Sequence, residues 1–137
     1  MKFISLILGV IFMSHYTFAG KNIVFKGYAH FKIKPEYVKP FSEEVRKIIK
    51  PTLQEKGCLR YEAYQLVDDN GQLTNEFLFH EVWKSKSDMM IDHKEKAPHM
   101  IRFFSLIKIG TSDSWVQSFE VSGHNVIQLD TSNKQVD

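Results

Sequence analysis

Apolar residues recur at every second position in some parts of this chain and at every third or fourth position in others. The order of these patterns constrains the fold. Residues 23–33 alternate between two faces and are rich in aromatic and β-branched types, which predicts a β-strand. Residues 35–56 carry apolar side chains at helical spacing, which predicts an amphipathic helix closed by Gly57. Pro51 lies inside this pattern, and we expect a kink or break there because its ring clashes with the carbonyl four residues earlier.

Two further strands follow the first predicted helix. Residues 58–67 alternate between two faces, and residues 75–83 form an apolar run rich in aromatic side chains. Between them, residues 68–71 read Asp-Asp-Asn-Gly, a sequence typical of turns. These segments predict an antiparallel hairpin with a long connection.

A second helical region and a final strand complete the pattern. Residues 85–88 combine a hydroxyl cap with an acid three residues later, as many helix starts do. Pro98 suits the first turn of a continuing or a second short helix, and residues 114–121 predict the last strand. The order is therefore βαββαβ. It predicts an α+β ferredoxin-like domain, a four-stranded antiparallel sheet with both helices on one face.

The sheet face without helices is also expected to carry large apolar side chains. Tyr28, Tyr64 and Leu78 belong to this face. The opposite face carries Phe25, Phe31, Phe77, Phe79 and Trp83. An uncovered apolar sheet face is a liability in a monomer. We therefore predict a homodimer in which two sheets pack face to face about a twofold axis.

Residues 1–19 have the layout of a secretory signal peptide. A basic residue precedes an eleven-residue apolar run at 3–13, and residues 17–19 end in a small-residue cleavage pattern. The run is shorter than the ~20 residues that span a bilayer, so we expect removal rather than retention as an anchor. Cleavage would give an exported protein, periplasmic or extracellular, that does not contact the membrane. Residues 20–129 would form one domain, and the polar residues 130–137 a disordered tail.

Charge and cysteine content narrow the class of protein further. Without residues 1–19 the chain would keep 17 basic and 16 acidic side chains, a balance without the footprint of nucleic-acid binding. Cys58 is the single cysteine, so no internal disulfide can form. We expect its thiol to act as a small buried hydrophobe rather than as a nucleophile.

Three stretches resemble the antibiotic biosynthesis monooxygenase (ABM) domain. They are GCLRYEAYQ at 57–65, FLFHEVWKSKSDM at 77–89 and DHKEKAPHM at 92–100, and the resemblance extends from Ile23 to about Val121. The nearest subgroup is that of the small quinol monooxygenases. The resemblance implies the same dimeric ferredoxin-like fold. Known members oxygenate electron-rich phenols or quinols without flavin, metal or haem, while others degrade haem, isomerise small sugar-derived signals, or have no established reaction.

The cofactor-free reaction needs a base, a dry pocket and a group that holds the substrate anion. His93 matches the histidine that the family places in this helix, and we predict that it is the base. Glu81 is predicted to orient the histidine or receive a proton, and Trp83 to wall an aromatic substrate. His99 would approach the opening of the same pocket. Arg102 would stabilise the substrate anion if its side chain points inward.

Two departures from the family pattern affect these assignments. Haem-degrading members have a tryptophan and a histidine where this chain has Asp92 and Arg102, which argues against haem degradation. Other members commonly have one residue fewer between the helical histidine and the Pro-His pair. The extra residue within 94–97 would re-aim His99.

The spacing of the two histidines also bears on metal binding. His93 and His99 stand six apart with Pro98 between them. Metal ligands on one face of a straight helix come three or four residues apart, as in the H-E-x-x-H pattern. We therefore expect no metal site, and the resemblance to the oxygenating ABM members implies a reaction without a cofactor.

The sequence predicts an exported homodimer that oxygenates a small quinol or phenol with dioxygen. Two other functions stay open. A non-catalytic dimer would bind a small aromatic or lipophilic ligand in the same pocket without turnover. A small-molecule isomerase would use the same base and consume no oxygen.

Overall fold

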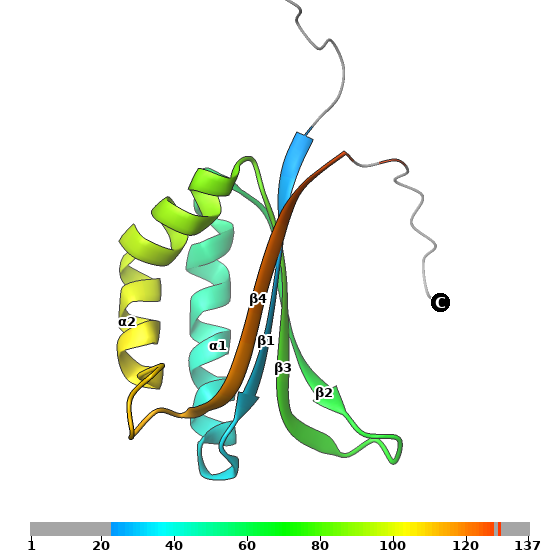
Figure 1. Ribbon diagram of the computed structural model, residues 1–137, viewed down its shortest axis with the longest axis vertical. Helices are drawn as coiled ribbons and strands as arrows, with labels where there is room; N and C mark the ends of the chain where they lie inside the picture. Colours follow the sequence, from blue (N-terminus) through cyan, green and yellow to red (C-terminus); the bar gives the residue numbers. More distant parts are fainter. Residues whose placement is uncertain (1–22, 128, 130–137) are drawn as a thin grey trace, which may run out of the picture.

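The structure is a computed structural model that describes residues 23–127 and residue 129. Four antiparallel strands form one sheet with the order β2-β3-β1-β4, and the helices lie together on one face (Figure 1). The elements are β1 (Ile23–Ile33), η1 (Pro35–Tyr37), α1 (Val38–Leu53), β2 (Cys58–Val67), β3 (Leu73–Trp83), η2 (Asp88–Lys96), α2 (Pro98–Ile107) and β4 (Val116–Ile127). This order confirms the predicted ferredoxin-like fold. The predicted signal peptide and the predicted tail lie outside the described residues.

The hydrophobic core lies between the sheet and the helices. The predicted alternation in β1 is confirmed, since every second side chain from Phe25 to Ile33 is buried, except where Gly27 has none. The ring centre of Phe31 lies 5.9 Å from that of Phe41 in α1, which lies 5.6 Å from that of Phe103 in α2. Burial of one such ring contributes about 1.5–3 kcal/mol, so these contacts fix which face of the sheet meets the helices.

Helix α1 ends at Leu53, three residues before the predicted end at Lys56. Pro51 lies in the last turn of α1. After this turn, the backbone N–H groups of Gln54 and Glu55 donate hydrogen bonds only three residues back, to the carbonyls of Pro51 and Thr52. The buried face also differs from the prediction, because Thr52 is buried and Leu53 is exposed. The early end matters for the site, since it leaves Glu55 in a turn between α1 and β2.

The second helical region is not a straight α-helix. Residues 88–96 form η2, a π-helix, which is a rare winding often found at functional sites. Ala97 then adopts an extended conformation, as residues before proline prefer, and Pro98 opens α2. This break separates His93, near the end of η2, from His99, in the first turn of α2.

Two strands are longer than predicted. Strand β3 begins at Leu73 rather than at residue 75, and β4 continues to Ile127 rather than ending at residue 121. The outer face of the sheet carries exposed aromatic rings, among them Tyr28 and Tyr64. Within the part of the chain that the structure describes, no helix has the length and apolar character needed to cross a membrane.

Candidate active site

An apolar cavity of about 260 Å³ lies between the sheet and the second helical region. Aromatic rings form much of its wall, including those of Phe31, Tyr61, Phe79 and Phe103. A cavity of about 150 Å³ is enough to hold benzene. This cavity can therefore hold one substituted aromatic ring or a small fused pair.

The cavity reaches solvent between η2 and the edge strand β4. Met90, Phe119 and Val121 line it, and they are 37%, 46% and 45% exposed, respectively. Phe119 also stacks on Phe31, with the ring centres 5.9 Å apart and the rings nearly parallel. An apolar ligand would thus pass an apolar mouth before it meets the polar groups inside.

Two charged side chains line this apolar cavity, Glu81 of β3 and Lys94 of η2. Glu81 is 4% exposed, and its Oε2 accepts a 2.9 Å hydrogen bond from Nε1 of Trp83. Burial raises the pKa of Glu81, while the charge of Lys94 and the bond from Trp83 act in the opposite direction. Burial lowers the pKa of Lys94, and the charge of Glu81 opposes that shift. An acid and an amine shifted toward each other in one cavity are typical of a catalytic acid/base site.

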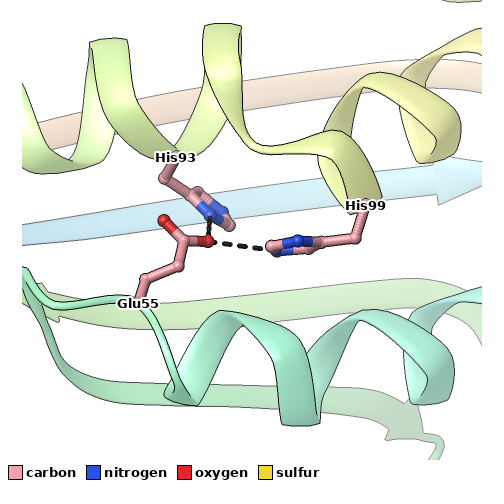
Figure 2. Close-up of side chains that lie close together, drawn as sticks. All are labelled: Glu55, His93 and His99. Atoms are coloured by element: carbon pink, nitrogen blue, oxygen red, sulfur yellow. Dashed lines mark hydrogen bonds and ion pairs between the residues drawn. The ribbon is translucent and has the colours of Figure 1, made fainter.

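A second cluster lies where the end of α1 faces the break between η2 and α2. His93 Nδ1 is 2.6 Å from Oε1 of Glu55, and His99 Nε2 is 3.0 Å from the same oxygen (Figure 2). His99 Nε2 also lies 3.0 Å from the hydroxyl of Thr52. Glu55 thus links the turn after α1 to both segments of the second helical region.

His93 is fully buried between aromatic rings. Its ring centre lies 4.7 Å from that of Trp83 and 5.6 Å from that of Tyr61. Burial lowers the pKa of His93 to about 3, helped by the charges of His99 and Lys94, so the imidazole is neutral at physiological pH. With the Nδ1 proton donated to Glu55, Nε2 is an acceptor, and it has no hydrogen-bond partner among residues 23–127 and 129.

Glu55 is the partner that keeps this imidazole in place. Burial, together with the negative charges of Glu81 and Asp92, raises the pKa of Glu55 to about 7. Its carboxyl group is therefore close to half protonated at neutral pH. In its ionised form the Glu55 carboxylate accepts the hydrogen bond from Nδ1, which fixes the tautomer and the ring direction of His93.

Residues 26–105 match the antibiotic biosynthesis monooxygenase family. The chain belongs to the ABM family. This match spans more than half of the chain and includes Glu81, Lys94 and the histidine cluster, whereas β4, which adds Phe119 and Val121 to the cavity, lies beyond it. A search of the curated proteins found no match.

Solved structures share the fold of this ABM chain. An antibiotic biosynthesis monooxygenase aligns with 25% identity and a TM-score of 0.55, over 79% of this chain and 99% of that chain. A proposed antibiotic biosynthesis monooxygenase from Nitrosomonas europaea aligns with 19% identity and a TM-score of 0.62, over 80% and 94%. A conserved protein from Methanosarcina mazei Go1 aligns with 22% identity and a TM-score of 0.60, over 75% and 92%.

The structure brings four of the five predicted ABM site residues into one connected set. Trp83 donates a hydrogen bond to Glu81 and packs against His93, and His99 joins His93 through Glu55. Among these residues, Glu81 alone lines the cavity. The predicted orientation of His93 by Glu81 is replaced by an interaction with Glu55.

Arg102 lies apart from this set. Its side chain is 54% exposed, and its Nη1 donates a 2.6 Å hydrogen bond to Oε2 of Glu44 in α1. Arg102 points along the outer side of the helices because the inward positions of α2 are taken by Met100, Phe103 and Ile107. Arg102 was predicted to stabilise a substrate anion only if it points inward, and it does not point inward.

Sequence reasoning missed Glu55 and Lys94. Glu55 lies 38 residues before His93, and no spacing rule connects a turn after one helix to the middle of another. Lys94 directly follows His93 on a segment expected to be α-helical, where adjacent residues point in different directions. The extra residue noted within 94–97 was the one available signal, because a π-helix accommodates an inserted residue.

Proposed function

We propose that this ABM protein oxygenates a small phenol or quinol that binds in the apolar cavity, with dioxygen as the second substrate. The observation that carries the proposal is the presence of both Glu81 and Lys94 in the wall of a cavity that is otherwise mostly aromatic and aliphatic. Membership of the family supports the reaction class. The cavity size supports a substrate of one or two rings.

The chain's own residues provide each requirement of the reaction. The Glu81 carboxylate takes the phenolic proton, and its raised pKa makes it a better base than a solvated carboxylate. The Lys94 ammonium then lies in the same cavity as the resulting phenolate and stabilises it. The phenolate transfers one electron to dioxygen, and the two radicals combine at a ring carbon to form a peroxide. Glu81 returns its proton to the peroxide, the same ring carbon loses its hydrogen as a proton, and the O–O bond breaks to release water. The product is the quinone, so phenol and O₂ yield quinone and H₂O without an external reductant.

His93, predicted from the sequence as the base, stays a second candidate. It is fully buried and does not line the cavity, whereas Glu81 does. A proton route to His93 would pass Tyr61, whose ring lies against it and also lines the cavity. The geometry therefore favours Glu81.

The first test is oxygen uptake by the chelator-treated chain without its predicted signal peptide, across a panel of quinols and phenols. Glu81→Gln keeps the size of the side chain and should lower the rate by about 100-fold or more, the usual contribution of a general base. Lys94→Met should lower the rate while leaving the fold intact. Glu76→Gln, on the opposite face of β3, is the matched control and should keep full activity.

The other outcomes separate the rival functions. Retained binding of the same ligands without oxygen uptake would favour the non-catalytic binding module. Conversion of a substrate without oxygen consumption would favour the isomerase. Full activity in Glu81→Gln together with loss of activity in His93→Gln would identify His93 as the base.

Two further proposals concern assembly and location. A homodimer packed through the outer sheet face is supported by the exposure of Tyr28 and Tyr64, which are 39% and 46% exposed. Export is supported by the signal-peptide pattern of residues 1–19 alone. Fractionation of cells that produce the full chain, with mass determination of the exported product, tests both cleavage after Ala19 and the destination.

A further inference from the structure

The cluster of Glu55, His93 and His99 has no part in the proton transfer assigned to Glu81. Each of the three residues offers one ligand atom, and these atoms all lie within 4.8 Å of one another. Within residues 23–127 and 129, this is the one group of histidine, cysteine and carboxylate side chains with that property. The three side chains come from three separate segments and converge on one point (Figure 2).

We propose that Glu55, His93 and His99 form a binding site for a divalent transition-metal cation. Two imidazoles and one carboxylate suit Zn²⁺ and the other late first-row divalent ions, whereas Mg²⁺ and Ca²⁺ prefer sites built from oxygen atoms alone. Three protein ligands leave further positions for water or a small anion. This inference goes beyond the proposed oxygenation and does not depend on it.

The distances from the Glu55 oxygen to the two imidazole nitrogens are near those of such a site. Ligands held about 2.0–2.1 Å from one metal ion lie about 2.8–3.4 Å from each other in octahedral or tetrahedral geometry. The Glu55 oxygen lies 2.6 Å from His93 Nδ1 and 3.0 Å from His99 Nε2. Outward movement of the Glu55 carboxylate by a few tenths of an ångström would therefore admit the ion.

The backbone that presents the two histidines supports a built site. On a straight α-helix, side chains six residues apart point in directions about 120° apart around the axis, so His93 and His99 would diverge. The π-winding of η2 and the extended Ala97 turn both imidazoles toward Glu55. The expectation of no metal site assumed a straight helix, and that assumption is wrong here.

A solvent-facing cavity gives the ion a route to the cluster. Glu55, His99 and Asp92 line this cavity, whose volume is about 340 Å³. Asp92 adds a second carboxylate to the lining of this cavity. Lys96 is the one lysine or arginine in the lining, and its Nζ lies 3.6 Å from Oδ1 of Asp92. The oxygenation cavity and this one share no lining residue, so occupancy of one does not block the other.

The competing explanation is a hydrogen-bonded tie between α1 and the second helical region. In that case Glu55 accepts one hydrogen bond from each histidine, and the cluster contributes to stability alone. The two explanations differ in one measurable respect. A tie binds no cation, whereas a metal site binds one per chain.

The test uses the untagged chain without residues 1–19, treated with a chelator and dialysed into a buffer that does not bind metals. Titration with ZnCl₂, monitored by isothermal titration calorimetry, should show saturable binding of one Zn²⁺ per chain. Glu55→Gln and His99→Gln should each weaken binding by more than about ten-fold, because ligand loss costs at least as much as loss of a supporting contact. His30→Gln is the matched control, since His30 pairs with a single carboxylate, Glu76, on the outer face.

A second measurement covers the case in which the ligand variants fold poorly. In the unmodified chain, Zn²⁺ should shift the NMR ring resonances of two histidines and raise the melting temperature. Shifts confined to His30, His80 or His124 would overturn the proposal. So would the absence of saturable binding, or binding that Glu55→Gln and His99→Gln leave unchanged in folded protein. Binding is measured without turnover, so its failure is distinguishable from failure of the oxygenase proposal.

Discussion

The indole nitrogen of Trp83 donates a 2.9 Å hydrogen bond to the carboxylate of Glu81, two residues earlier on the same face of β3. Trp83 is fully buried, and its ring packs against His93, with the ring centres 4.7 Å apart. It therefore contacts both the proposed base, Glu81, and the second candidate, His93. One residue links the two candidates.

Replacement of Trp83 by phenylalanine should change the behaviour of Glu81 through its lost donor. The hydrogen bond lowers the pKa of Glu81, so Trp83→Phe should raise that pKa and move the acid limb of the oxygen-uptake profile to higher pH. The lost bond and the smaller ring should also cost about 1–3 kcal/mol of stability in urea unfolding. Trp115→Phe, which alters a ring stacked on Tyr37, should leave the pH profile unchanged. An unshifted profile in Trp83→Phe would show that the bond does not tune Glu81.

The buried carboxyl of Glu81 should make the protein less stable as the pH rises. Burial raises its pKa in the folded state, so below the unfolded pKa both states are protonated and Glu81 makes no difference. Above that pH the unfolded state ionises first, and stability is lost until the pH passes the folded pKa. Glu81→Gln removes this loss and should raise the unfolding free energy at pH 8 by about 1 kcal/mol or more, with little change at pH 4. Urea unfolding at both pH values, with Glu76→Gln as control, checks the prediction. A gain of the same size at pH 4 would contradict it.

The cavity itself can be tested without changing any charge. Ala29 lines it from β1 and is 6% exposed, so Ala29→Leu should project three extra carbon atoms into the substrate volume. We expect kcat/KM for a quinol to fall by about ten-fold or more, since one methylene group in a binding pocket already changes discrimination by that amount. Stability should change by at most about 1–3 kcal/mol, because the added volume fills a void. Unchanged kinetics in a folded Ala29→Leu variant would place the substrate elsewhere.

The strands could be predicted from the sequence because their signal is local. In β1, Ile23–Ile33 alternates a buried and a solvated face, and the predicted and observed bounds agree. Strand β4 extends six residues beyond its predicted end because pairing with β1 overrides the weak strand propensity of Ser122, Gly123 and Asn125. A Cβ atom at Gly123 would meet the ring of Phe25, so the packing requires a glycine at a position where glycine has weak strand propensity.

The site could be predicted only in part, because its geometry depends on long-range packing. Trp83 and Glu81 share a strand face, and their proximity follows from alternation alone. The meeting of His93 with His99 depends on π-winding, which leaves no trace in the hydrophobic period. Glu55 reaches them only because α1 ends at Leu53, three residues earlier than its apolar pattern indicates. Chain topology, rather than any motif, completes the cluster.

The outer face of the sheet should hold the proposed homodimer together. Tyr64 of β2 is 46% exposed there, and its ring centre lies 5.5 Å from that of His80. Tyr64→Lys would bring two like charges into a twofold interface and replace apolar ring surface, so the dimer should dissociate in sedimentation velocity. Leu53→Lys is the matched control, because Leu53 is similarly exposed, at 51%, but lies at the end of α1 on the helical side. A dimer that survives Tyr64→Lys and dissociates in Leu53→Lys would place the interface on the helices instead.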